Sequence, residues 1–234
     1  MGAESREISK REIWRKAEDI PSDIPRDRLY ILPTLPTQDE SDTPADAEED
    51  TFVFLQALAE GFPASRIIAA IEWQARDAEL EQIAKGKLRG ILRAAVYGRF
   101  SLLVEGINTR NDYALFCKIF SETFCELEEE KREFNGYIEK GIAISTPLGA
   151  LSAAKEQTDF LCVKIDELSA LMRGSGFAQG AKIDGDETAE LSQAISKLLS
   201  EAKAPVFCIA QTASPLISHP PQLCNLHEIW TIPD

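Results

Sequence analysis

The stretch FLCVKIDELSALM, residues 160–172, decides the fold. An apolar run ends in the acidic pair Asp166-Glu167, and a helical pattern follows. A buried strand delivers such carboxylates to the carboxyl edge of a sheet, where open α/β sheets bind their ligands. One carboxylate there can hold the shell of a Mg²⁺ ion, and the next can polarise a water molecule. The simpler alternative is that Asp166 only caps the helix that follows.

The downstream sequence continues the same α/β pattern. A Gly-rich stretch at 173–187 predicts a surface loop, and apolar residues recurring with helical spacing over 191–199 predict a helix. VFCIAQTASP, residues 206–215, is a second apolar strand that ends in the polar pair Gln211-Thr212, and HEIWTI, residues 227–232, predicts a last short strand. Strand, helix and strand in this order predict parallel pairing with a right-handed crossover. We therefore expect the C-terminal half to be an α/β domain with a parallel sheet.

The upstream sequence divides by composition. Residues 1–50 form a charged arm followed by a Pro-rich acidic linker, a composition typical of disorder. Residues 51–98 favour helices, and residues 99–234 are expected to form the α/β domain, beginning with a strand at 99–108 and an amphipathic helix at 113–127.

The helical region at 51–98 allows two interpretations. A first helix stops at Gly61, and Ser65 can cap a second helix that carries Ile67, Ile68 and Ile71. Two short helices around a glycine-containing turn are also how a DNA-binding helix-turn-helix begins. Ordinary packing of these helices is the alternative to a DNA-binding role.

Composition narrows the class of protein. The 234 residues carry a formal net charge of −14, which disfavours nucleic-acid binding over the whole surface. Apolar runs are too short to span a bilayer, and no secretory signal begins the sequence, so we expect a cytoplasmic protein without membrane contact. The five cysteines form no CxxC pair, and we expect Cys162 and Cys208 to be reduced and buried.

Three segments taken together resemble a known family. VKIDELSALM, CIAQTASP and the following PLISHPPQLCNLHEIWTI are similar in order and spacing to the Walker B-to-sensor half of RecA-like ATPases of the FtsK/HerA DNA-translocase type. The resemblance implies ATP and Mg²⁺ as cofactors, with Asp166 as the magnesium ligand and Glu167 as the catalytic carboxylate. It further implies that Gln211 senses the γ-phosphate, that Thr212 assists it, and that the partners are DNA and either further copies or a partner ATPase subunit.

The sequence departs from that family at the phosphate-binding loop. GxxxxGK[ST] is absent from the chain, and the nearest candidate, AKGKLRGIL at 84–92, has only Gly86-Lys87. The resemblance therefore predicts a degenerate or incomplete ATPase, and whether the chain is an enzyme stays open. The alternative is a non-catalytic interaction or regulatory protein on an α/β scaffold. A hydrolase using His219 or His227 is least favoured, because no GxSxG motif is present.

Overall fold

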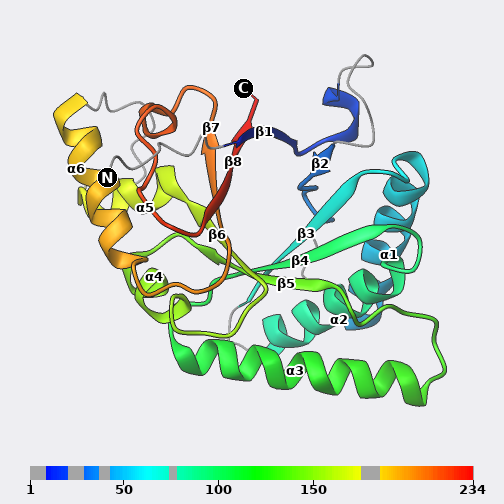
Figure 1. The fold of residues 1–234 in the computed structure, drawn as a ribbon. Coiled ribbons are helices and arrows are strands. Elements are labelled where there is room, and N and C mark those ends of the chain that lie inside the picture. Colours follow the sequence, from blue (N-terminus) through cyan, green and yellow to red (C-terminus); the bar gives the residue numbers. More distant parts are fainter. Residues whose placement is uncertain (1–8, 21–28, 37–42, 74–77, 175–184, 234) are drawn as a thin grey trace.

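Eight parallel strands close into one barrel in the computed structural model, which describes residues 9–20, 29–36, 43–73, 78–174 and 185–233 (Figure 1). Each strand pairs with the next, and the last strand pairs in parallel with the first. The strands are β1 (Ser9–Trp14), β2 (Tyr30–Ile31), β3 (Arg66–Glu72), β4 (Arg99–Glu105), β5 (Glu139–Ile144), β6 (Phe160–Lys164), β7 (Val206–Gln211) and β8 (Leu226–Ile232). The closed ring leaves no sheet edge among these strands.

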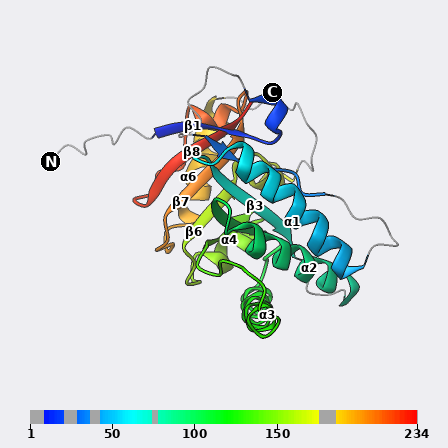
Figure 2. The same cartoon turned by 90° about the vertical axis from the view of Figure 1, so that its right-hand side faces the viewer.

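Helices connect the strands and cover the outside of the barrel. They are η1 (Ala17–Asp19), α1 (Pro44–Gly61), α2 (Ala78–Ala94), α3 (Arg110–Glu129), α4 (Pro147–Ala153), α5 (Ile165–Met172), α6 (Gly185–Leu198) and η3 (Pro215–Ile217). In Figure 1, α1, α2 and α3 lie along the right and lower sides, whereas α4, α5 and α6 lie on the left. Figure 2 shows α1 and α2 running beside each other across β3. Strands alternating with helices in this way form a (βα)-type barrel.

Threonines begin three of the helices. Thr43 before α1 and Thr109 before α3 each form a capping box, in which the threonine side chain accepts from the backbone of Asp46 or Asp112 and the aspartate accepts in return. Thr146 caps α4 in the simpler way, by accepting from the backbone N–H of Gly149. These local signals fix where each helix leaves the carboxyl end of its strand.

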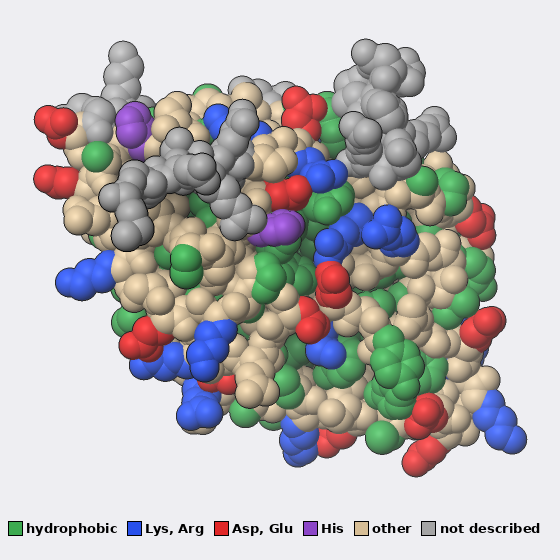
Figure 3. All heavy atoms as spheres, viewed as in Figure 1, with side chains coloured by type: hydrophobic (Ala, Val, Ile, Leu, Met, Phe, Trp, Pro, Cys, Tyr) green, Lys and Arg blue, Asp and Glu red, His purple; other side chains and the backbone are tan. Residues whose placement is uncertain are grey.

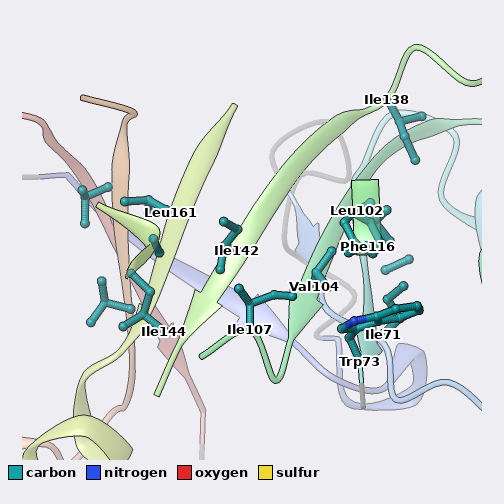
Figure 4. Packing of buried hydrophobic residues seen from close by; sticks show 14 of the residues in the cluster. Ile71, Trp73, Leu102, Val104, Ile107, Phe116, Ile138, Ile142, Ile144 and Leu161 are labelled. Carbon is teal, nitrogen blue, oxygen red and sulfur yellow. The ribbon is translucent and has the colours of Figure 1, made fainter. Parts of the chain in front are cut away.

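The strands are apolar on both faces because two cores lie against them. Inside the barrel, one cluster gathers Ile13, Leu32, Ile68, Leu103, Ala143, Phe160, Cys162, Phe207, Ile209, Trp230 and Ile232. A larger cluster fills the space between the strands and the helices, where the ring of Trp73 meets that of Phe116 at 5.8 Å (Figure 4). Sheets covered on both faces show such near-continuous apolar strands.

An ion pair fastens the first strand to the last. Arg11 donates from Nε and Nη2 of its guanidinium group to Glu228, at 3.2 and 2.9 Å, and the indole of Trp230 donates to the same carboxylate at 3.1 Å. Burial alone would raise the pKa of Glu228, but the hydrogen bonds from Arg11 and Trp230 outweigh it and lower the pKa. The carboxylate therefore stays charged where the barrel closes.

The expected fold class was wrong. A closed eight-stranded barrel replaces the open RecA-like sheet with a separate helical N-terminal half. The expected second helix at 65–71 is strand β3, because Ile67, Ile68 and Ile71 pack on both faces of the barrel wall. Because these residues form a strand, they cannot be the second helix of a helix-turn-helix. The predicted domain boundaries at 50 and 98 fall within the barrel, since β1 and β2 precede the first and β3 lies between them.

Several local predictions were confirmed. The strands expected within 99–108, 160–172, 206–215 and 227–232 correspond to β4, β6, β7 and β8, and the helix expected at 113–127 lies within α3. Cys162 and Cys208 are free and buried, as expected. Burial raises the pKa of both thiols, that of Cys208 to about 12, so both remain protonated.

The surface mixes both signs of charge. Acidic and basic side chains alternate, with apolar ones between them, over the face seen in Figure 3. Two arginines of the region 51–98 pair with acidic side chains: Arg89 contacts Glu48 and Glu130, and Arg93 contacts Glu48 at 2.7 Å. These arginines tie α2 to its neighbouring helices. Among the described residues, no helix combines the length and the apolar character needed to cross a membrane.

Candidate functional site

A cavity of about 1290 Å³ opens at the carboxyl ends of the strands. We call it the mouth. Its walls are partly apolar, with Leu32, Pro33, Ala70, Ile209 and Ile232 among them. In barrels of this kind the active site lies at this end, where the loops that follow the strands meet.

One lysine and two carboxylates, contributed by two strands and one helix, form the centre of one side of the mouth. Lys164 ends β6, and its Nζ lies 2.7 Å from Oε2 of Glu105, which ends β4, and 3.7 Å from Oε1 of Glu167 in α5. Burial lowers the pKa of Lys164, but Glu105 and then Glu167 outweigh this and raise it. Lys164 is thus a fixed ammonium held between two carboxylates.

Asp166 joins the ends of β6 and β7. Its Oδ2 accepts from the backbone N–H of Gln211 at 2.9 Å, and its Oδ1 accepts from the hydroxyl of Ser214 at 2.5 Å. Gln211 and Ser214 both line the mouth. Asp166 therefore holds the segment that follows β7 against the start of α5. We call Glu105, Lys164, Asp166 and Glu167 the β6 side of the mouth.

The four site residues chosen from the sequence lie near one another, but in different settings. Asp166, Glu167 and Gln211 line the mouth, with Asp166 and Gln211 on neighbouring strand ends as expected for parallel strands. Thr212 does not line it; its hydroxyl donates to the backbone carbonyl of Ile232 at 2.9 Å and so links β7 to β8.

Magnesium and ATP at these residues stay predictions. Both oxygens of Asp166 already accept hydrogen bonds, and Glu167 faces the ammonium of Lys164. Within the described ranges, no group of three potential ligands among His, Cys, Asp and Glu could hold a metal ion. Asp166 and Glu167 would have to give up these contacts to enter the oxygen shell that a divalent cation needs.

A second side of the mouth carries cations in a different setting. Lys87 of α2 lines the cavity and is partly buried, and burial lowers its pKa, although the charge of Glu72 at the end of β3 raises it in part. Over the described part of the chain, Lys87 has no hydrogen bond or ion pair. The same holds for Arg15, which follows β1 and is exposed at the rim. We call Arg15, Glu72 and Lys87 the β3 side of the mouth.

Sequence reasoning missed the part that Lys87 plays in the mouth. The sequence marked this residue as part of Gly86-Lys87 in an incomplete phosphate-loop motif, not as a residue of a ligand site. Gly86 has another explanation, since a Cβ there would meet the carbonyl oxygen of Pro44 at 2.2 Å, so the glycine lets α1 and α2 approach closely. The half-buried position of Lys87 depends on the barrel, which brings α2 to the mouth.

Comparisons with known proteins agree with the barrel. No family model matches the chain. Phosphoenolpyruvate-protein phosphotransferase of Haemophilus influenzae is 29% identical over an alignment of 103 residues, and the match covers 41% of this chain but only 18% of that protein. A citrate lyase from Burkholderia xenovorans has a TM-score of 0.53 at 13% identity, covering 87% of this chain and 65% of that one. Malate synthase of Haloferax volcanii, solved as a lead(II) complex, has a TM-score of 0.58 at 11% identity, covering 96% and 69%.

These findings overturn the resemblance to FtsK/HerA translocases. The two structures share the barrel fold, which has no RecA-like sheet, so the function as a degenerate P-loop ATPase or DNA translocase is withdrawn. The short match arose because an apolar strand followed by Asp-Glu occurs in parallel barrels as well as in parallel open sheets. At such low identity the two structures show the fold alone.

Proposed function

We propose that this chain is a lyase-type barrel enzyme that binds a small carboxylic acid in the mouth. The observation that carries the proposal is Lys87, a partly buried cation that faces a large cavity without a hydrogen bond or ion pair in the described part of the chain. A buried charge is costly unless it is paired, so such a lysine favours an anionic ligand.

The names of the similar proteins support the chemical class. Phosphoenolpyruvate, citrate and malate, which appear in those names, are all small carboxylic acids. A carboxylate on the ligand would pair with the ammonium of Lys87, and the apolar wall formed by residues such as Leu32 and Ile209 would contact the carbon skeleton. Small-molecule sites combine mostly apolar walls with a few polar groups in this way.

The β6 side supplies the groups for a reaction. Glu105 and Glu167 offer carboxylates as bases, and the ammonium of Lys164 between them offers a proton donor. A carboxylate removes a proton from the carbon beside a ligand carbonyl. The C–H electron pair forms a carbon–carbon double bond, and the carbonyl electrons move to the oxygen, which Lys164 stabilises.

Two measurements test the proposal. Calorimetry should detect binding of pyruvate but not of its neutral amide, and Lys87→Met should weaken binding by at least about tenfold. Lys203→Met is the matched control, because Lys203 is exposed before β7, at the opposite end of the barrel. Equal binding of pyruvate by the wild type and Lys87→Met would refute the assigned role of Lys87.

The catalytic step has its own test. Proton NMR in D₂O should show that the wild type exchanges the methyl protons of pyruvate for deuterium, and that Lys164→Met exchanges them at least about a hundredfold more slowly. Binding without exchange would leave a ligand-binding protein and exclude the proposed step.

A further inference from the structure

Among the residues that the structure describes, charges of both signs line the mouth in equal number. The cations are Arg15, Lys87, Lys164 and Arg173, and the carboxylates are Glu72, Glu105, Asp166 and Glu167. A partly buried site that takes a multiply charged anion normally carries a clear excess of cations or several inward N–H donors, as phosphate sites do. Equal numbers of cations and carboxylates therefore do not favour a ligand with several negative charges.

Two of the four cations are already neutralised. Lys164 faces two carboxylates, so this group of three carries an excess of one negative charge. Arg173 donates to Glu187 at 2.7 Å. Protein carboxylates already balance both cations, so neither offers an uncompensated positive charge to a ligand.

The remaining two cations, Arg15 and Lys87, differ in how strongly each can attract an anionic ligand. Arg15 is exposed at the rim, where water screens its attraction for an anion. Lys87 is partly buried, and among the described residues Glu72 acts on it as a nearby charge. Within the described part of the chain, the mouth therefore holds one cation, Lys87, in a position to neutralise a buried negative charge.

We infer that the mouth selects acids with a single negative charge and disfavours phosphorylated, di- and tricarboxylic acids. This inference rests on the proposed function and specifies its substrate class: a monocarboxylate with a short carbon skeleton. A phosphoryl group brings about −1.5 to −2 charges at neutral pH. On the β6 side it would meet the excess negative charge of Glu105 and Glu167 rather than a free cation.

The first experiment compares four acids on the wild-type protein. Calorimetry at pH 7 and constant ionic strength should give the tightest binding for pyruvate, at least about tenfold tighter than for phosphoenolpyruvate, malate or citrate. Tighter binding of phosphoenolpyruvate, malate or citrate than of pyruvate would overturn the charge limit and leave the proposed function standing. If none of the four acids bound, the proposed function itself would fall, and this inference with it.

The second experiment removes the excess negative charge from the β6 side of the mouth. Glu105→Gln keeps the shape of the side chain but removes one of the two charges that neutralise Lys164. We expect the affinity for phosphoenolpyruvate to rise by about tenfold relative to that for pyruvate. Glu167→Gln removes the other charge and serves as the second variant if Glu105→Gln fails to fold.

A matched control separates local charge from net charge. Glu201→Gln makes the same change at an exposed position before β7, remote from the mouth, where Glu201 lies 3.6 Å from Lys155. The control should leave the ratio of the two affinities unchanged. If Glu105→Gln and Glu167→Gln also left it unchanged, pairing by these carboxylates would not set the charge of the ligand, and the inference would be overturned.

Discussion

The β6 side and the β3 side of the mouth each present a lysine, and the two lysines lie in opposite electrostatic settings. Lys164 is held between two carboxylates, and its pKa is raised. Lys87 is partly buried beside the charge of one carboxylate, Glu72, and its pKa is lowered. A cation that protein groups neutralise contributes to folding, whereas one that they leave without a contact partner contributes to binding. Substitutions on the β6 side should therefore change mainly stability, and substitutions on the β3 side should change mainly ligand affinity.

Replacing Lys164 by methionine should lower the free energy of unfolding, whereas replacing Lys87 should not. Lys164→Met leaves Glu105 and Glu167 without the cation that both contact, and we expect a loss of about 2 to 3 kcal/mol in the free energy of unfolding. Lys87→Met removes a poorly solvated charge and should leave stability unchanged or raise it by less than about 1 kcal/mol. Urea unfolding at pH 7 measures both; equal losses would contradict the contrast.

The raised pKa of Lys164 also sets a pH dependence for the wild type. A lysine whose pKa is higher in the folded state stabilises the protein below its unfolded pKa of about 10.4, and this contribution disappears as the pH rises through the folded value. Urea unfolding across this range should show the loss in the wild type and not in Lys164→Met.

The connection between β6 and β7 should show the next largest effect. Asp166→Ala removes the acceptor of two hydrogen bonds, from Gln211 and Ser214, and should cost about 2 kcal/mol. Asp166→Asn keeps one acceptor oxygen and should cost about half as much. Hydrogen exchange at the amide of Gln211 is the direct measurement. Unchanged exchange in both variants would show that Asp166 does not hold this segment.

Binding on the β3 side should depend on pH in a way that identifies Lys87. An anion needs the protonated amine, and burial lowers the pKa of this lysine, so affinity should fall at a lower pH than the ordinary lysine pKa of about 10.4. Lys87→Arg stays protonated over this range and should bind pyruvate with a flat pH profile. If the affinity of the arginine variant fell over the same range as that of the wild type, another group would be titrating.

Much of the barrel wall follows from the sequence, because half of the strands are self-contained apolar runs. β6 and β7 were predicted from such runs, and parallel pairing correctly put Asp166 beside Gln211. β3 misled because RIIAAIE places isoleucines at spacings that fit a helix equally well. β2 is two residues long and gives no periodic signal.

Closure of the barrel and the contents of its mouth required long-range information. The contact of Arg11 with Glu228 joins residues 217 positions apart, and no local pattern specifies it. The contact of Lys164 with Glu105 spans the end of the intervening strand β5, so it depends on the order of strands in the sheet. Treating the chain as an open sheet hid both contacts and also hid the position of Lys87.

The smallest expected effect concerns two arginines at the first strand, one paired with a carboxylate and one exposed. Arg11 forms the double hydrogen bond with Glu228, whereas Arg15 is exposed at the rim of the mouth. Arg11→Met should cost about 1 kcal/mol, and Arg15→Met should change stability by less than about 0.5 kcal/mol.

The pH dependence supplies the decisive control for the Arg11 pair. The lowered pKa of Glu228 means that its contribution is present above its unfolded pKa of about 4.3 and is lost as the pH falls through the lower, folded value. The difference in unfolding free energy between the wild type and Arg11→Met should therefore shrink in acid, while that for Arg15→Met stays near zero. A difference that persisted at pH values well below the pKa of Glu228 would mean that Arg11 stabilises the barrel by packing over the ring of Tyr30, 4.3 Å away, rather than through the charge of Glu228.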